Sequence, residues 1–221
     1  MTIQELYQSS LFTFAQQPDN ERFSNDFYNA INESQDEFCN QPHKWGCLRT
    51  SGSVTTTTST RGVSLPNNFG SFFDEDGAIR VSSPSTSVGN TIELITASQY
   101  YADHYDADAE DEPTYCWREG DTLNFSYIPD AEYTVTFLYY KRPTAVGNTK
   151  DSLTIPTRYH ELLKKLIFRR LQVLGYTAVQ EISISDSDIE RYYGMAAQND
   201  IAEYGGLVFN LPSSTYKIET T

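Results

Sequence analysis

The fold is decided by the stretch IPDAEYTVTFLYYKRPTAVGNTKDSLTIPTRYHELLKKL, residues Ile128–Leu166. Its first part alternates with a period of two, which is typical of a β-strand, and one face collects Tyr133, Val135, Phe137 and Tyr139. Pro143 ends this strand, because proline cannot donate to a ladder. After a polar loop, Pro156 presets a first-turn angle, and the apolar spacing changes to that of a helix at Tyr159, Leu162, Leu163, Leu166 and Ile167. The stretch therefore predicts a strand followed by a helix.

Helical spacing recurs towards both ends of the chain. It predicts helices over residues 3–16, 21–40, 157–174 and 186–204, each with one apolar face to bury. In the second of these helices the stripe is Phe23, Phe27, Ile31 and Phe38. Gly175 and the pair Gly205-Gly206 are typical C-terminal stops for the last two.

Between the two pairs of helices the sequence is typical of short strands. The threonine-rich run SGSVTTTTST, residues 51–60, favours an edge strand and hairpin. Strands are expected at 78–82, 91–95, 115–118, 122–127 and 133–140, separated by turn signals such as Asp76-Gly77 and Gly120-Asp121. The sequence thus predicts an α+β protein: a small helical bundle (1–48 and 150–205) with an inserted antiparallel β-sandwich or barrel (49–149) and an extended C-terminal arm (206–221).

Composition excludes several classes of protein. The chain has 221 residues and a formal net charge of -14, which argues against gripping nucleic-acid phosphates, since that affinity comes from Lys and Arg. No apolar run approaches the ~20 residues of a membrane span, and the amino terminus lacks the pattern of a secretory signal. Three cysteines cannot all pair within one chain, so reduced thiols and assembly in a cytoplasm are expected.

Two clusters suggest metal sites. The acidic run Asp103–Glu112 resembles a calcium loop, but counting from Asp106 puts Asp111 and Trp117 where glycine and glutamate are needed. Cys39, His43 and Cys47 lie four apart, yet Pro42 interrupts a helix that would align them, and only Cys116 is left as a further cysteine. A solvated acidic loop and half-buried thiols are the favoured interpretations, and no metal or other cofactor is predicted.

Candidate catalytic groups lack partners in the sequence. His160 and His104 could titrate, but no nucleophile accompanies either of them. The carboxylates Asp74, Glu75 and Asp76 lie in a turn-rich stretch, and no glycine-rich phosphate loop is present. The chain is therefore not expected to be an enzyme.

Two surfaces suggest assembly. Arg158, Lys164, Lys165, Arg169 and Arg170 place five of 16 basic residues on one predicted helix. This ridge is either an ordinary solvated face, a subunit contact that meets a neighbour's carboxylates, or a DNA-facing ridge; the second is favoured. The arm carries apolar residues without a partner element in the chain, which either dock elsewhere or stay disordered: Leu207, Val208, Phe209, Leu211 and Tyr216.

In order along the chain, several of these stretches resemble the head-to-tail adaptor (connector) proteins of tailed bacteriophages, especially short-tailed ones. They are NDFYNAINESQDEF (25–38), Trp45, SLPNNF (64–69), EPTYCWREGDTLNFSYIPDAEYTVTFLYYKRP (112–143) and IPTRYHELL (155–163). The resemblance runs from Phe23 to Tyr176. The amino-terminal helix and the tail after Gly205 depart from it, and the proline-rich landmark of the family in the strand Thr122–Pro129 is thinner here.

The resemblance implies a structural protein of the virion, at the head–tail interface, assembled in the host cytoplasm without a membrane. Such adaptors form a ring, typically dodecameric, beneath the portal protein, and a tail nozzle or tail tube protein binds below. The arm would reach along the portal, so its five apolar residues named above are candidates for portal binding. Genomic DNA would pass through the lumen without specific binding, which an acidic wall favours.

Two other functions are weighed. A carbohydrate- or receptor-binding β-sandwich module of a tail fibre or baseplate would need exposed aromatic residues in a groove, with Trp117 and Tyr115 as candidates. A cell-wall hydrolase would need a nucleophile or a metal site, and the sequence offers neither clearly.

Overall fold

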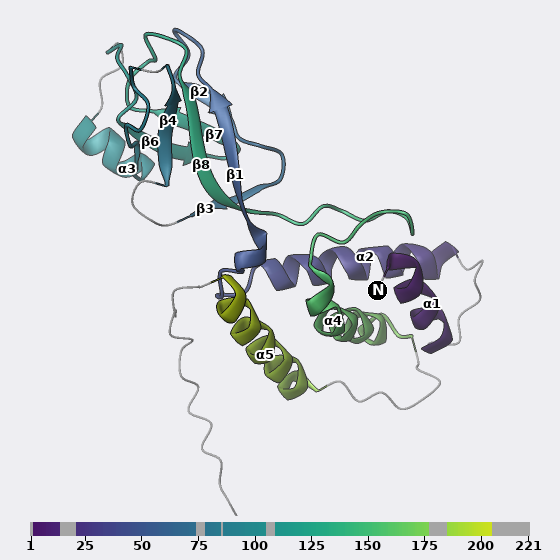
Figure 1. Ribbon diagram of the computed structural model, residues 1–221. Helices are drawn as coiled ribbons and strands as arrows, with labels where there is room; N and C mark the ends of the chain where they lie inside the picture. The colour runs from purple at the N-terminus through teal and green to yellow at the C-terminus, as the bar shows by residue number, and fades with distance from the viewer. Residues whose placement is uncertain are drawn as a thin grey trace, which may run out of the picture. The chain divides into compact units, whose positions relative to one another are not determined.

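The computed structural model describes residues 2–13, 21–73, 78–84, 86–104, 109–176 and 185–204. The chain divides into two compact units (Figure 1). The helical unit comprises Met1–Leu48 and Arg142–Thr221, and the β unit comprises Arg49–Lys141. The predicted class is confirmed: an α+β protein in which a β unit is inserted between helices.

In the helical unit, the helices are α1 (Ile3–Thr13), α2 (Glu21–Cys39), α4 (His160–Val173) and α5 (Asp186–Tyr204). A short 3-10 turn, η3 (Thr157–Tyr159), precedes α4. Helices α2 and α4 pack against each other through the predicted apolar stripes, all of which are buried: Phe23, Phe27, Ile31 and Phe38 on α2, and Leu162, Leu163, Leu166 and Ile167 on α4. Burial of these stripes, rather than helix propensity, supplies most of the stabilisation.

The described residues of the β unit form two four-stranded sheets. In one, β8 (Thr134–Lys141) pairs with β1 (Arg49–Thr55) on one side and with β3 (Phe69–Phe72) and β4 (Ile79–Ser83) on the other. The other has the order β2 (Gly62–Ser64), β7 (Thr122–Phe125), β6 (Tyr115–Glu119), β5 (Glu93–Leu94). Every pairing is antiparallel except that of β5 with β6.

The alternation predicted for β8 is confirmed. Val135, Phe137 and Tyr139 point into the core, where they meet Phe69, Val81 and Phe125 from other strands. The strand expected over 91–95 is reduced to the two residues of β5, and the turn-like segment around Asn67-Asn68 leads directly into β3. A one-turn helix, α3 (Ala97–Gln99), follows β5 and begins with a capping box made by Thr96 and Gln99.

Both chain segments that connect the units are fixed to the helical unit. On the way in, the indole of Trp45 stacks on Phe38 at 4.0 Å and donates to the Phe38 carbonyl at 2.7 Å. On the way out, the Asn32 side chain exchanges two hydrogen bonds with the backbone of Val146, at 2.7 and 3.0 Å. Because an asparagine amide imitates a peptide group, this pair acts like one rung of a β-ladder between α2 and the returning chain.

No helix among the described residues combines the length and the apolar character needed to cross a bilayer.

Candidate functional site

The basic residues singled out in the sequence lie along one helix and the turn before it. Lys164, Lys165, Arg169 and Arg170 belong to α4, whereas Arg158 lies in the η3 turn. The four α4 residues are half-buried. Their surroundings show whether the ridge is open to a partner.

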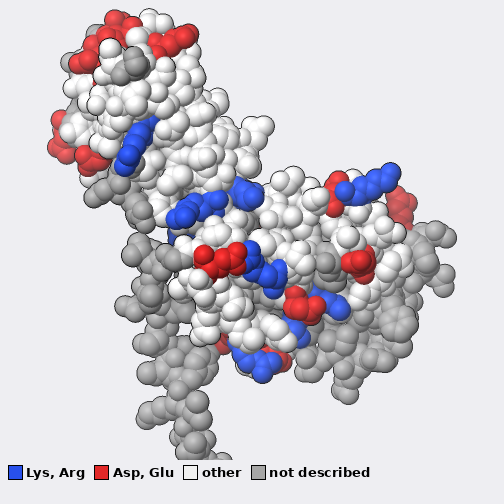
Figure 2. All heavy atoms as spheres, in the orientation of Figure 1, with Lys and Arg blue, Asp and Glu red and all other residues white. Residues whose placement is uncertain are grey.

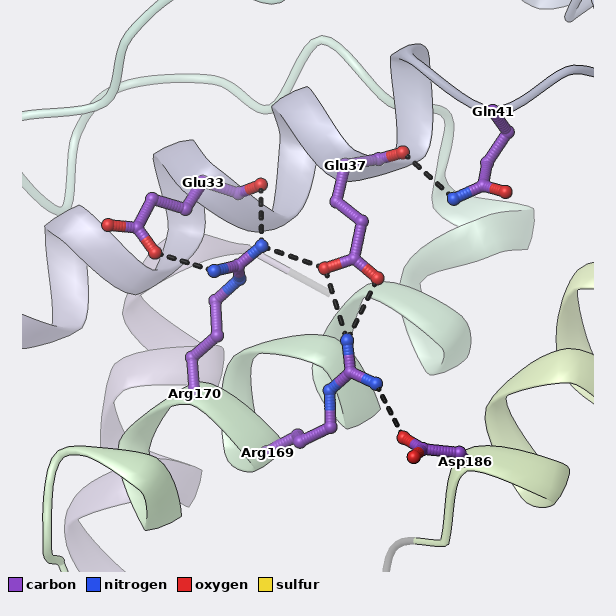
Figure 3. Close-up of polar contacts among 6 residues, drawn as sticks. All are labelled: Glu33, Glu37, Gln41, Arg169, Arg170 and Asp186. Atoms are coloured by element: carbon purple, nitrogen blue, oxygen red, sulfur yellow. Dashed lines mark hydrogen bonds and ion pairs between the residues drawn. The ribbon is translucent and has the colours of Figure 1, made fainter.

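Arg169 and Arg170 form a network with carboxylates of their own chain (Figure 3). The carboxylate of Glu37 lies between the two guanidinium groups, 2.9 Å from Arg169 Nη2 and 2.7 Å from Arg170 Nη2. Arg169 also binds Asp186 at 2.9 Å, and Arg170 binds Glu33 at 2.6 Å. The network links α2, α4 and α5, so these two arginines fasten the helical unit together.

The remaining cations of the ridge lie beside aromatic rings. Lys164 Nζ is 5.4 Å from the ring centroid of Phe168, and Lys165 Nζ is 4.6 Å from that of Tyr192. Arg158 forms an ion pair with Glu203 and donates to the Tyr204 hydroxyl at 3.0 Å. On the face shown in Figure 2, basic and acidic side chains accordingly interleave over the helical unit.

Beside this network lies a groove of about 460 Å³ between α2 and the end of α4. It is lined by Asp26, Asn29, Ala30 and Glu33 of α2 and by Arg169, Arg170, Val173 and Leu174. Val173 at its rim is 83% exposed. The lining combines charged and apolar side chains, which suits contact with a protein better than with a small ligand.

Asp200 on α5 is a buried acidic residue of the helical unit. It is only 2% exposed, yet its carboxylate accepts four hydrogen bonds. The donors are the Tyr159 hydroxyl at 3.0 Å, the Gly46 N–H at 2.7 Å, the Cys47 N–H at 3.3 Å and the His43 ring at 3.0 Å. Asp200 therefore fixes the segment that leads into the β unit onto α5 and η3.

The titration of this cluster follows from its geometry. Burial opposes ionisation of Asp200, but the hydrogen bonds from His43, Gly46 and Tyr159 outweigh it and lower the pKa of the carboxyl. Burial, with the Asp200 charge nearby, raises the pKa of the Tyr159 hydroxyl. Burial and the charge of Asp200 also raise the pKa of Cys47 to about 12, so this thiol stays protonated.

The cysteine and histidine residues considered as zinc ligands have other surroundings in the structure. His43 turns its ring to Asp200, and the thiols of Cys39 and Cys47 are half-buried. Cys116 lies in the core of the β unit. Among the residues that the structure describes, no group of three or more His, Cys, Asp or Glu side chains is placed to hold a metal ion.

The other candidates from the sequence are scattered. His160 is buried and bonds the Ile155 carbonyl at 3.0 Å. His104 ends a π-helical turn, Tyr100–His104. Asp74, Glu75 and Asp76 lie outside the described residues, as do 105–108 of the acidic run. Glu112, at the end of that run, accepts hydrogen bonds from Ser87 and Asn90 at 2.8 and 2.7 Å.

The aromatic pair proposed for a carbohydrate groove is not an exposed platform. Trp117 is 2% exposed and is stacked on Tyr100 at 3.9 Å, so its ring is covered. Tyr115 is half-buried. The expectation of an exposed Trp117 is wrong, because the short α3 and the turn after it lay Tyr100 over the indole.

The predicted portal-arm residues Leu207, Val208, Phe209, Leu211 and Tyr216 lie outside the described part of the chain.

The comparison with protein families identifies the chain. The family model of the SU10 adaptor protein matches residues 1–206. This range covers the whole β unit and the helical unit as far as Gly206. The chain belongs to the SU10 adaptor protein family. Members of this family are structural adaptor proteins of phages. No curated protein matches the sequence.

For this SU10 adaptor family member, sequence reasoning found the cations of the helical unit but missed the residues that organise them. Glu37 and Asp200 look like ordinary polar positions on amphipathic helices. One signal was available for Asp200: it falls on the apolar stripe of α5, four residues after Ala196, where a carboxylate is expected to need partners.

Proposed function

We propose that the protein forms a ring beneath the portal of a short-tailed phage, joins the head to the tail and continues the channel through which DNA leaves. The observation that carries the proposal is the family match, because it spans residues 1–206 and therefore both units. The resemblance of the stretch from Phe23 to Tyr176 to head-to-tail adaptors supports the same assignment.

The two units suit two sets of partners. In our proposal the helical unit faces the portal and the β unit faces a tail nozzle or tail tube protein. The C-terminal arm, which carries Leu207, Val208, Phe209, Leu211 and Tyr216, is assigned to the portal.

The five basic residues of the ridge are not equally suited to the proposed subunit contact. Arg158, Arg169 and Arg170 already neutralise carboxylates of their own chain, so a neighbour's carboxylate would have to compete for them. Lys164 and Lys165 lie over aromatic rings and are the better candidates for contacts between copies.

The acidity of the β unit suits a passage for DNA. Residues 49–141 contain 14 Asp and Glu against five Lys and Arg. On the face shown in Figure 2, acidic side chains gather at one end of this unit. Each phosphate–cation contact adds affinity that slows a moving DNA, so a wall poor in cations favours release.

The proposal is tested by removing the gene from a phage that carries it. Loss of the adaptor is expected to leave DNA-filled heads without tails, and supplying the protein in trans should restore tailed particles. Normal numbers of tailed, infectious particles without the protein would contradict the proposed role.

A further inference from the structure

The exposed apolar residues of the helical unit gather at two places. Among its described residues, the large hydrophobic side chains that are exposed are Val173, Leu174 and Met195. Val173 and Leu174 line the groove between α2 and the end of α4. Met195 lies in the middle of α5, is 54% exposed and is not part of that lining. One apolar site is therefore concave, and the other is the convex face of a helix.

The face of α5 around Met195 is open. Arg191 and Asn199, one turn to either side of Met195, are exposed as well. A Cβ on Gly194 would have nothing within 4 Å apart from the neighbouring helix backbone. Glycine destabilises a helix relative to alanine, and no described neighbour requires it here. Because glycine allows another backbone to approach closely, Gly194 suits a face that a further chain covers.

The groove of about 460 Å³ is the matching hollow, with room for a methionine side chain. Its apolar lining is formed by Ala30, Val173 and Leu174. On its wall the side chain of Glu33 is 61% exposed, and its ion pair with Arg170 uses only Oε2 (Figure 3). Within the described residues, the other carboxylate oxygen of Glu33 has no bonded partner, so it is available to a cation of another chain.

Charge favours a second copy as the occupant of this groove. In a chain of net charge -14, copies repel each other wherever acidic surfaces meet. The α5 stretch before Met195 instead balances Asp188 and Glu190 with Arg191, and Lys165 lies close by. The groove lining likewise has two carboxylates and two guanidinium groups. Two copies can therefore meet here with little repulsion, and Arg191, whose side chain is 66% exposed, can pair with Glu33.

A ring also needs two different surfaces on each copy. In a head-to-tail ring, one patch of a copy meets a different patch of the next copy, and the rotation between them closes the circle. The groove lies on α2 and α4, whereas the open face around Met195 lies on α5, so the helical unit presents two such patches. One is hollow and the other projects, so each fits the other better than it fits itself.

We propose that the face of α5 around Met195 packs into the groove between α2 and the end of α4 of a neighbouring copy. Met195 would lie against Val173, because a flexible thioether fills irregular apolar hollows. Gly194 would let the two copies approach closely, and Arg191 would pair with Glu33. This inference rests on the proposed ring and names the contact that joins its copies.

The first test traps the contact as a disulfide between copies. Full-length Val173→Cys and Met195→Cys chains are mixed, added to portal rings and treated with glutathione disulfide, which is reduced as the two thiols are oxidised. A bond forms only where the two Cα atoms lie within about 7 Å. Covalent dimers linked from position 173 to position 195 should appear in the mixture, but not with either variant alone or the wild type. A chain with both substitutions should give a ladder longer than a dimer, because each copy then links to two neighbours.

Matched variants separate this contact from chance collisions and from effects on folding. Val88→Cys, at a residue of the β unit that is 59% exposed, should give little cross-linking with Val173→Cys. Gly194→Gln should stabilise the isolated chain, yet its side chain obstructs the close approach and should raise the concentration for half-maximal assembly on the portal about tenfold or more. Gly194→Ala brings a similar gain in helix propensity with a smaller side chain and should weaken assembly less. Circular dichroism checks that each variant is folded.

The outcomes are distinct. Adaptor rings on the portal without a bond between positions 173 and 195, or equal assembly of the wild type, Gly194→Ala and Gly194→Gln, overturn the inference and leave the proposed function standing. A bond from position 195 to the portal instead of to another copy also overturns the inference. If the wild type does not assemble on the portal, the inference and the proposed function both fail.

Discussion

The Tyr159 hydroxyl donates a 3.0 Å hydrogen bond to the buried carboxylate of Asp200, which joins the start of α4 to the last turns of α5. The same carboxylate accepts the backbone N–H of Gly46 at 2.7 Å. Three segments far apart in sequence therefore depend on one ionised side chain.

Replacing Asp200 with asparagine should destabilise the helical unit by about 3 kcal/mol, because an amide cannot accept from all four donors and leaves buried groups unsatisfied. Urea unfolding of the wild type and Asp200→Asn at pH 7 measures the difference. Asn199→Ala, one residue away on the exposed side of α5, is the control and should change stability by less than about 0.5 kcal/mol.

The contribution of Asp200 should depend on pH in a defined direction. Its native pKa is lowered below the ordinary value of 3.8, so the unfolded state binds the proton first as pH falls. The difference in the free energy of unfolding between wild type and Asp200→Asn should have its full value above a pH of about 4 and should shrink as the pH falls below it. A difference that grows on acidification would contradict this account.

Glu37 should contribute more to stability than Glu33, although both bind Arg170. Glu37 bridges two guanidinium groups and its side chain is 22% exposed, whereas that of Glu33 is 61% exposed. Glu37→Gln should cost about 1–2 kcal/mol and Glu33→Gln less than about 0.5 kcal/mol. Thermal unfolding of both variants checks the order, and equal effects would count against a shared network.

The position of the segment around Val146, which returns from the β unit, should depend on Asn32. Asn32→Ala removes both hydrogen bonds to Val146 and should cost about 2 kcal/mol, since it leaves a partly buried peptide group unpaired. Hydrogen exchange of the Val146 amide reports the loss directly. Asn29→Ala, on the exposed face of α2, should leave that exchange rate unchanged.

Two glycines should respond to alanine in opposite directions. A Cβ on Gly46 would lie 2.4 Å from the Cβ of Tyr204, so Gly46→Ala must displace the end of α5 and destabilise by about 2 kcal/mol. Gly194 on α5 has nothing within 4 Å of such a Cβ, and Gly194→Ala should stabilise by about 0.5–1 kcal/mol. Guanidinium midpoints of the two variants test the contrast.

Much of this architecture could be predicted from the sequence because it rests on periodicity. The apolar stripe of α2 and the alternation of β8 are local patterns, and burial selects them directly. The strand β2 could not be predicted, since Gly62–Ser64 owes its state to pairing with β7, which lies 58 or more residues later in the chain. Pairing of distant segments leaves no local signature.

The candidate sites were predicted less well, for a related reason. The arginines of α4 were conspicuous as charges, but their partners Glu33 and Glu37 lie on a helix more than 130 residues away. From the sequence alone Trp117 is a candidate for an exposed ring, because nothing in its strand predicts that Tyr100 will cover it. Charge and aromaticity can be found in a sequence, whereas exposure depends on packing.

The central claim is that identical copies assemble on a portal, and imaging the complex tests it most directly. Purified protein is mixed with portal rings, and the particles are examined by cryo-electron microscopy. We expect a closed ring of adaptor copies coaxial with the portal, with a channel through its centre. Particles that show bare portals beside monomeric protein, or single copies bound at random positions, would contradict the account.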